Sequence, residues 1–218
     1  MNKRIYIISF LALLLSSFYS ANFTEITWQD LIPHSEEIVD PFKELSPEVL
    51  EDLKSLVRLR NKMGTTPSES NLSREKEIED KLSKGGIDYD KLLDQRLQII
   101  ESRYEASIAT VQKLNGKSVS ISGFMLPLEI MNNETSEFLL VPWVGACIHT
   151  PPPAGNQIVY VKLKEPLKIS GLYDAVSVKG KLIIQSNNKE LFLKDGNGSI
   201  GSSYTIIPEE LEKLDLSK

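Results

Sequence analysis

The sequence predicts an α+β protein in which an N-terminal helical hairpin packs on a small β-barrel of the OB type. Helical periodicity runs through residues 46–113, and strand-like alternation replaces it from Ser118 onward. Two glycines, Gly123 and Gly180, fall inside predicted strands, as expected where a five-stranded barrel coils sharply. A β-sandwich is the alternative arrangement of the same strands.

The composition is that of a soluble globular chain and excludes several classes of protein. The 218 residues carry 25 basic and 30 acidic side chains, a net charge of −5 that disfavours non-specific nucleic-acid binding. The single cysteine excludes an internal disulfide framework and a zinc site made of cysteines alone. Two histidines, His34 and His149, are too few for a multi-histidine metal cage.

The N-terminus resembles an export signal. Lys3 and Arg4 precede the apolar run 5–15, which has signal-peptide length and is too short to span a bilayer comfortably. Small residues follow, so we expect residues 1–21 to be removed near Ser20–Asn22. The mature chain would then be periplasmic or secreted, without a transmembrane span, and more acidic, with 23 basic and 30 acidic residues.

The mature chain begins with an extended arm over residues 22–44, broken by prolines. Trp28 and Leu31 are the apolar anchors in this polar stretch. We expect the arm to pack on the folded domain, and a partner-binding motif is the alternative. Three segments follow: a helical region over 45–114, the barrel over 115–208 and a C-terminal tail over 209–218.

The region 45–114 contains residues that typically begin and end helices. Ser46 is an N-cap, Pro47 fits the first helical position and Gly64 ends the helix. A short charged helix is expected over residues 73–84.

The longest predicted helix covers residues 88–113 and carries a heptad seam. Its apolar positions are Tyr89, Leu93, Leu97, Ile100, Tyr104, Ile108 and Val111. We expect this seam to lie against the core or the first helix. A homodimer through residues 88–113 is the alternative.

Short strands are expected throughout the barrel segment, because β-branched and aromatic residues alternate there with polar ones. The candidates are residues 118–126, 137–143, 157–163, 176–184, 190–194 and 204–207. Predicted turns separate them at residues 132–133, 151–155, 187–188 and 196–198. The run 137–143 is apolar at nearly every position, unlike its neighbours.

The run VPWVGACIHTPPPAGNQ, residues 141–157, could carry chemistry. Cys147 and His149 are two positions apart, so in an extended segment they share one face at roughly 6–7 Å. That separation suits two ligands of one metal ion, or a thiol activated by an imidazole. The three prolines favour a stiff polyproline II segment. Candidate binding residues around the pair are Trp143, Thr150, Pro151, Pro152, Pro153, Asn156 and Gln157.

Three interpretations of this run stay open. Cys147 could be a buried thiol in a loop shaped by prolines. Cys147 and His149 could bind zinc, with further ligands from Glu129 or Asp174, a partner chain or water. The same pair could form a thiol-dependent enzyme, which would also need an orienting group and an oxyanion hole.

Several segments resemble a bacterial family of exported proteins, domain-of-unknown-function family 3299. They are residues 118–129, 138–161 and 176–182, with ITWQDLIP and GIDYDKLLDQR upstream. The block CIHTPPPAGNQ is highly specific to that family. The resemblance implies a secreted or periplasmic protein without an established activity. It also implies genes beside permeases of the ABC type that move lipids or lipoproteins, sometimes in metal-responsive clusters.

Together these observations predict a non-enzymatic periplasmic binding or adaptor protein. Its expected partner is an ABC-type envelope transport system or another periplasmic protein, and its expected cofactor is zinc at Cys147 and His149. A thiol-dependent enzyme and a purely structural interaction module are the alternatives.

Overall fold

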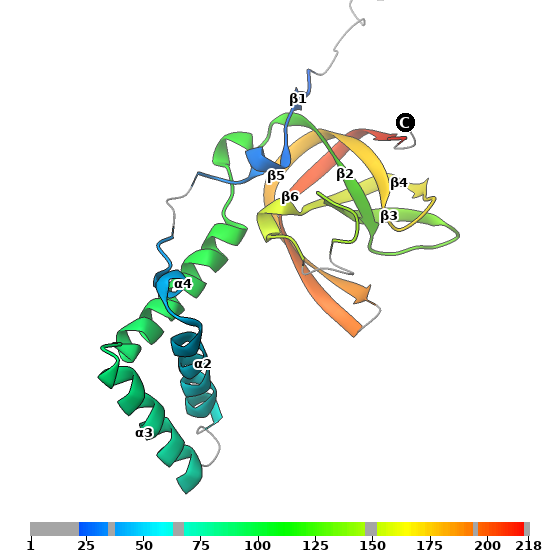
Figure 1. The fold of residues 1–218 in the computed structure, drawn as a ribbon. Helices are drawn as coiled ribbons and strands as arrows, with labels where there is room; N and C mark the ends of the chain where they lie inside the picture. Colours follow the sequence, from blue (N-terminus) through cyan, green and yellow to red (C-terminus); the bar gives the residue numbers. More distant parts are fainter. Residues whose placement is uncertain (1–21, 35–37, 63–67, 147–151, 194–195, 216–218) are drawn as a thin grey trace, which may run out of the picture. The chain divides into compact units, whose positions relative to one another are not determined.

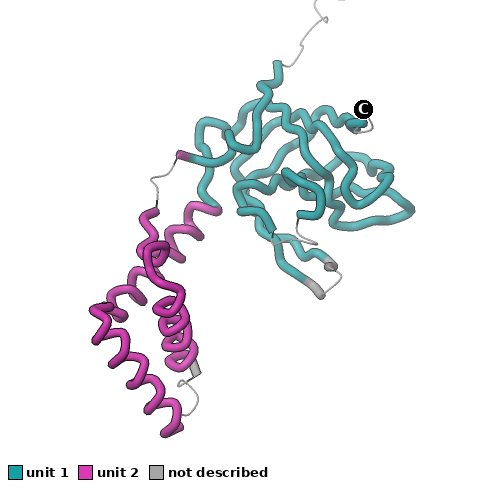
Figure 2. Tube along the Cα trace, viewed as in Figure 1, with its two compact units in different colours: residues 1–33, 108–218 teal, residues 34–107 magenta. Residues whose placement is uncertain are grey.

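The computed structural model describes residues 22–34, 38–62, 68–146, 152–193 and 196–215. These residues form two compact units, one of residues 34–107 and one of residues up to 33 together with 108 onward (Figure 2). The chain is thus α+β: residues 34–107, the helical unit (magenta in Figure 2), hold three helices, and the other residues, the sheet unit (teal), hold a six-stranded mixed sheet. Among the described residues, no helix combines the length and apolar character needed to cross a bilayer.

The helical unit contains α2 (Pro47–Lys62), α3 (Glu69–Lys84) and most of α4 (Tyr89–Ile108), preceded by the 3-10 helix η2 (Pro41–Glu44). Ser46 caps α2 as predicted, since its Oγ accepts a hydrogen bond from the Val49 N–H at 3.3 Å. The expected short helix is instead a full 16 residues long, because its N-cap is Ser68 and the helix begins at Glu69, four residues before Ser73. A small core of Leu53, Leu56, Ile78 and Leu82 joins α2 to α3.

The longest helix ends earlier than its heptad pattern predicts. α4 stops at Ile108, and a 3-10 turn, η3 (Gln112–Leu114), follows. Two side chains form hydrogen bonds with the backbone at this point: Ser203 Oγ donates to the Ile108 carbonyl, and Asn156 Nδ2 donates to the Ala109 carbonyl. These bonds compete with helical ones. Tyr89 and Leu93 pack against the small core between α2 and α3. Four later positions of the heptad seam are exposed, namely Leu97, Ile100, Tyr104 and Ile108.

The sheet contains β1 (Thr24–Glu25), β2 (Ser118–Pro127), β3 (Glu134–Val141), β4 (Val159–Lys168), β5 (Asp174–Leu193) and β6 (Gly196–Lys213) (Figure 1). Its order is β1-β2-β3-β4-β6-β5, and β2 also pairs with β5. The pairing therefore closes into a ring of five strands, with β1 added in parallel to β2. All ring pairs are antiparallel except β4 with β6.

Two long strands replace the short ones expected near the C-terminus. Residues 176–184 and 190–193 belong to the single strand β5, and β6 continues to Lys213, past the expected end of the strand segment at residue 208. The Asn187-Asn188 pair was predicted to turn and does not. Asn187 instead sits at a register irregularity, where its Nδ2 donates to Gln185 O and Thr205 Oγ1.

The inner face of the ring holds the main core. Alternate residues of every ring strand contribute, including Ile121, Met125, Phe138, Leu140, Val161, Val178, Leu182, Tyr204 and Ile206. The first part of the N-terminal arm packs here as expected, since Leu31 is fully buried and Trp28 Nε1 donates to the Ser122 carbonyl at 2.9 Å. Gly123 leaves room for this indole, because a Cβ there would lie 2.8 Å from Trp28 Cζ2. The rest of the expected arm belongs to the helical unit, where Phe42 packs against the small core between α2 and α3.

A second core lies on the opposite face of β2, β3 and β4. It joins Leu139 and Val141 to Ala146 and Ile158 of the loop after β3, and to Leu191 and Ile200 of the β5–β6 hairpin. Because β3 is covered on both faces, Phe138 to Val141 are all fully buried. This explains why the run 137–143 is apolar at nearly every position instead of alternating.

Candidate functional site

The candidate site is the loop that connects β3 to β4, residues 142–158. Its first part forms a turn in which the Ala146 N–H donates to the Trp143 carbonyl at 3.4 Å. Gly145 has a φ of 83°, a backbone conformation that glycine adopts without strain. Ala146 is fully buried, and its carbonyl accepts a hydrogen bond from Tyr173 Oη at 2.8 Å.

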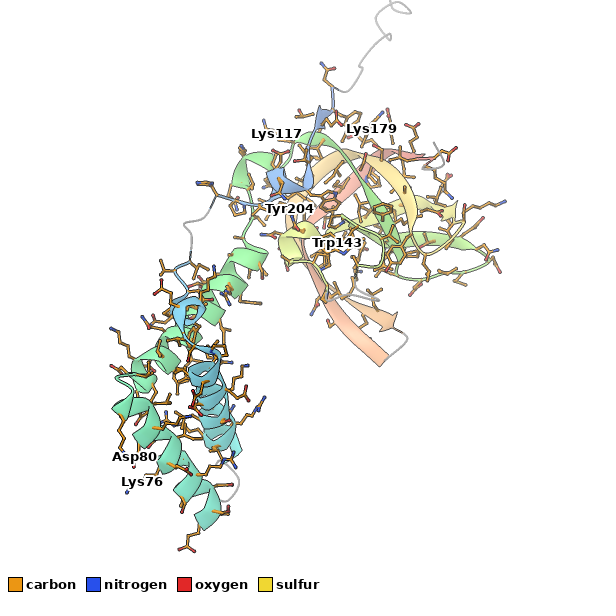
Figure 3. All side chains as sticks on the ribbon, in the orientation of Figure 1. Lys76, Asp80, Lys117, Trp143, Lys179 and Tyr204 are labelled. Carbon is orange, nitrogen blue, oxygen red and sulfur yellow. The ribbon has the colours of Figure 1, made fainter. Side chains whose placement is uncertain are left out.

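This turn exposes two large apolar side chains beside a buried anchor. Trp143, labelled in Figure 3, is 41% exposed and Val144 is 58% exposed. Surface turns of this kind usually carry small polar residues. The turn therefore presents two apolar side chains on a backbone that the second core fixes at Ala146.

The far end of the loop is fixed as well. Pro153 is buried, and the 3-10 turn η4 (Gly155–Gln157) packs on β6, where a Cβ at Gly155 would lie 3.4 Å from Ser203 Oγ. Asn156 is 2% exposed, and its Nδ2 donates to the Ala109 carbonyl at 3.0 Å. Asn156 thus binds backbone of its own chain.

The other predicted site residues divide into two groups. Pro152 is exposed and Gln157 is partly buried, so both are near the loop surface. Cys147, His149, Thr150 and Pro151 lie outside the described residues. Trp143, Pro152, Pro153, Asn156 and Gln157 are the predicted site residues of this loop that the structure describes. His34 is exposed, as expected for the arm.

A metal site was one interpretation of this loop. Within the ranges that the structure describes, no three His, Cys, Asp or Glu side chains gather as a metal-binding group. Asp174, one of the two carboxylates considered as an additional ligand, already binds Lys213 Nζ at 2.7 Å and the Ser170 N–H at 2.8 Å. Although burial opposes it, these bonds hold the pKa of Asp174 below its ordinary value, so the carboxylate is engaged elsewhere.

Sequence reasoning missed a charged cluster beside the second core. The Glu137 carboxylate binds Lys162 Nζ at 2.8 Å, Tyr160 Oη at 2.8 Å and Lys189 Nζ at 3.2 Å. Lys189 Nζ also lies 4.4 Å from the centroid of the Tyr160 ring. The alternation of β3 marks Glu137 as a polar position, but only the tertiary structure brings in Lys189, 52 residues away.

This cluster strongly favours the ionised form of Glu137. The hydrogen bond from Lys162, together with those from Tyr160 and Lys189, outweighs burial and lowers the pKa of Glu137 from 4.5 to about 2. Burial and the neighbouring carboxylate raise the pKa of Tyr160. Lys162, Tyr160 and Lys189 therefore keep Glu137 ionised. Because the four residues lie on β3, β4 and β5, the cluster fixes the β5–β6 hairpin to β3 and β4.

We predict that Glu137→Gln destabilises the sheet unit by about 1–3 kcal/mol at pH 7. Because the folded pKa is depressed, the stabilising effect is complete above the unfolded pKa of 4.5 and is lost as pH falls towards about 2. Urea unfolding of both proteins between pH 7 and pH 3 should show the difference narrowing with falling pH. Glu190→Gln, at an exposed position of β5, is the control. A difference that is independent of pH would contradict the assignment.

No curated protein matches the chain. One solved structure similar to it is the crystal structure of a DUF3299 family protein, PA4066, from Pseudomonas aeruginosa PAO1. The two share 23% sequence identity, with a TM-score of 0.49, over 90% of this chain and 99% of that chain. The family model described as a protein of unknown function, DUF3299, matches residues 28–213. This match covers both compact units and the loop after β3, and the chain therefore belongs to the DUF3299 family.

Proposed function

We propose that this chain is an exported binding or adaptor protein of the cell envelope that contacts its partner through the loop 142–158. The observation that carries the proposal is the exposure of Trp143 and Val144 on a turn whose neighbour Ala146 is fully buried. Tryptophan is enriched among the residues that dominate binding energy at protein interfaces. Because the second core and the Tyr173 hydrogen bond already fix Ala146 beside this turn, little conformational entropy of the turn would be lost when a partner binds.

We also infer that the five-stranded ring is a small barrel of the OB type. Its closure around five strands, antiparallel apart from the β4–β6 pair, supports this inference. OB-folds bind oligonucleotides and oligosaccharides on the face of their second and third strands. Here the outer face of β3 and β4 is covered by Ala146 and Ile158 of the chain's own loop. A partner would therefore meet the loop and not the strands.

The partner that we propose is a component of an ABC-type envelope transport system. The resemblance of the loop sequence to exported proteins encoded beside such permeases is the basis for this choice. Export would depend on residues 1–21, which lie outside the described residues. Cys147 and His149 would bind zinc, since a thiolate and an imidazole are suitable ligands for this ion. With Asp174 engaged by Lys213, Glu129, the partner or water would supply the remaining ligands.

The test is site-specific photocrosslinking in the native cell envelope. A benzoylphenylalanine in place of Trp143 should crosslink to a component of an ABC-type transport system. The matched control places the same group at Met131, which is 72% exposed in the turn between β2 and β3. Identical products from both positions, or no product from position 143, would contradict the proposal.

A repeat of the crosslinking with a zinc chelator tests the metal part separately, with Cys147→Ala combined with His149→Ala as the genetic equivalent. Loss of the crosslink under both conditions supports a zinc-linked contact. An unchanged crosslink refutes the zinc role and leaves the loop contact in place.

A further inference from the structure

The helical unit contains an apolar groove between α2 and α4, with a volume of about 510 Å³. Its apolar lining includes Phe42, Leu50, Val57, Leu93, Ile99 and Ile100. Ligand sites for small molecules have volumes of roughly 300–1,000 Å³ and mostly apolar walls. All the lining residues belong to the helical unit, so the groove does not depend on the sheet unit or its loop.

Four cations line the same groove: Lys54, Arg58, Arg96 and Arg103. A single acidic residue, Asp40, lines it with them. This charge is opposite to that of the surrounding unit, where residues 34–107 hold seventeen acidic and twelve basic side chains. The groove is thus lined by four of the twelve basic side chains of the unit and by only one of its seventeen acidic side chains.

Most of this positive charge is not neutralised by strong pairs. Arg103 binds Asp40 at 2.6 Å, while Lys54 and Arg58 share the exposed Glu51 at 3.3 and 3.6 Å. Exposed pairs of this kind contribute about 0–1 kcal/mol, so they are easily exchanged for another anion. Arg96 makes no ion pair within the described part of the chain.

We infer that this groove binds a fatty acid, with the acyl chain on the apolar floor and the carboxylate held by Arg58 and Arg96. Arginine suits this role because its guanidinium donates two parallel hydrogen bonds to a carboxylate. The lining runs from Leu50 to Arg58 on α2 and from Leu93 to Arg103 on α4, about 12 and 15 Å at 1.5 Å per residue. That length suits a single acyl chain.

The same observations disfavour protein occupants. A stable protein interface buries about 800 Å² on each partner, far more than two or three helical turns provide. A second copy of this chain docked symmetrically on the groove would bring its four cations close to the same four cations. The groove therefore fits a small anionic amphiphile better than a helix or a second copy.

Calorimetric titration of the purified full chain with dodecanoate tests the inference. We expect about one dodecanoate per chain with a Kd in the range of tens of micromolar, since about 6–7 kcal/mol is attainable for a ligand of this size. Dodecanol, which has the same chain and no charge, should bind at least about tenfold more weakly. Dodecyltrimethylammonium, which carries the opposite charge, should bind no better than dodecanol.

Charge reversal locates the site. Arg58→Glu combined with Arg96→Glu should weaken dodecanoate binding by at least about tenfold. Lys76→Glu is the matched control, an exposed lysine on α3 outside the groove and labelled in Figure 3, and it should change the Kd by less than about twofold. Far-UV circular dichroism verifies that the helices of each variant are intact. Equal binding of dodecanoate and dodecanol, an unaffected double variant, or binding only of an acidic amphipathic peptide would each overturn the inference.

Discussion

Replacement of Gly180 by alanine is expected to destabilise the sheet unit by about 3 kcal/mol or more, at or above the upper end of what overpacking costs. A Cβ at this position would collide with the Ile207 carbonyl oxygen, and would lie 2.9 Å from Pro208 Cα and 3.0 Å from Ile206 Cγ2. The first two obstacles are backbone atoms. They cannot move aside as a side chain would, so the β5–β6 pairing itself must shift.

The register explains why the backbone comes so close at this point. Lys179 pairs with Glu210 and Gly180 with Pro208, which leaves Glu209 as an extra residue in β6. Proline has no N–H to donate to a ladder, and such residues are found at bulges and edges. Gly180 lets β5 approach the irregular stretch of β6, and a side chain there would separate the two strands.

Equilibrium unfolding in urea, followed by tryptophan fluorescence, measures this loss of stability in the sheet unit. Trp28 and Trp143, the two tryptophans of the chain, both belong to the sheet unit. Gly171→Ala is the control, because a Cβ there would meet no atom within 4 Å. We expect that variant to unfold within about 0.5 kcal/mol of the wild type. A Gly180→Ala protein as stable as the control would show that the strands separate without cost.

Much of the fold could be predicted from the sequence because local signals and tertiary structure agree there. Ser46 and Pro47 begin α2, the arm buries Leu31, and Gly123 lies where Trp28 crosses the sheet. The prediction failed where tertiary hydrogen bonds override a local preference. Asn187 has turn propensity, yet bonds to Gln185 and Thr205 keep it in β5.

The sequence singles out one segment as the candidate site, but it does not tell which residues of that segment are exposed and which are buried. The loop sequence singled out Trp143 and Asn156 together, although the structure exposes the first and buries the second against the Ala109 carbonyl. A sequence pattern cannot separate these outcomes, because both depend on segments far away in the chain. The Glu137 cluster could not be predicted for the same reason, because its Lys189 belongs to the β5–β6 hairpin, far away in the sequence.

The second large effect is expected at Tyr204, where replacement by phenylalanine should cost roughly 2–4 kcal/mol in the free energy of unfolding. Tyr204 is fully buried, and burial raises the pKa of its phenol. Its Oη donates to the Leu31 carbonyl at 2.8 Å and accepts from the Val111 N–H at 2.6 Å. Phenylalanine keeps the ring but leaves both backbone groups without this partner.

The magnitude follows from the number of groups left unsatisfied. Each buried donor or acceptor that loses its partner costs about 1–3 kcal/mol, more than the hydrogen bond itself contributes. One hydroxyl serves two such groups here, and they come from the arm and from the segment after α4. Its loss should therefore loosen both segments together, and hydrogen exchange at the Val111 amide should accelerate with the fall in stability.

Tyr104→Phe separates this effect from the general removal of a phenol. Tyr104 is 64% exposed on α4, so its hydroxyl faces water, and we expect a change below about 0.5 kcal/mol. If Tyr204→Phe were equally harmless, the Leu31 carbonyl and the Val111 amide would have to form hydrogen bonds with water inside the ring of five strands. If only Tyr204→Phe destabilises the sheet unit, one buried hydroxyl joins β6 to the arm and to the chain that leaves the helices.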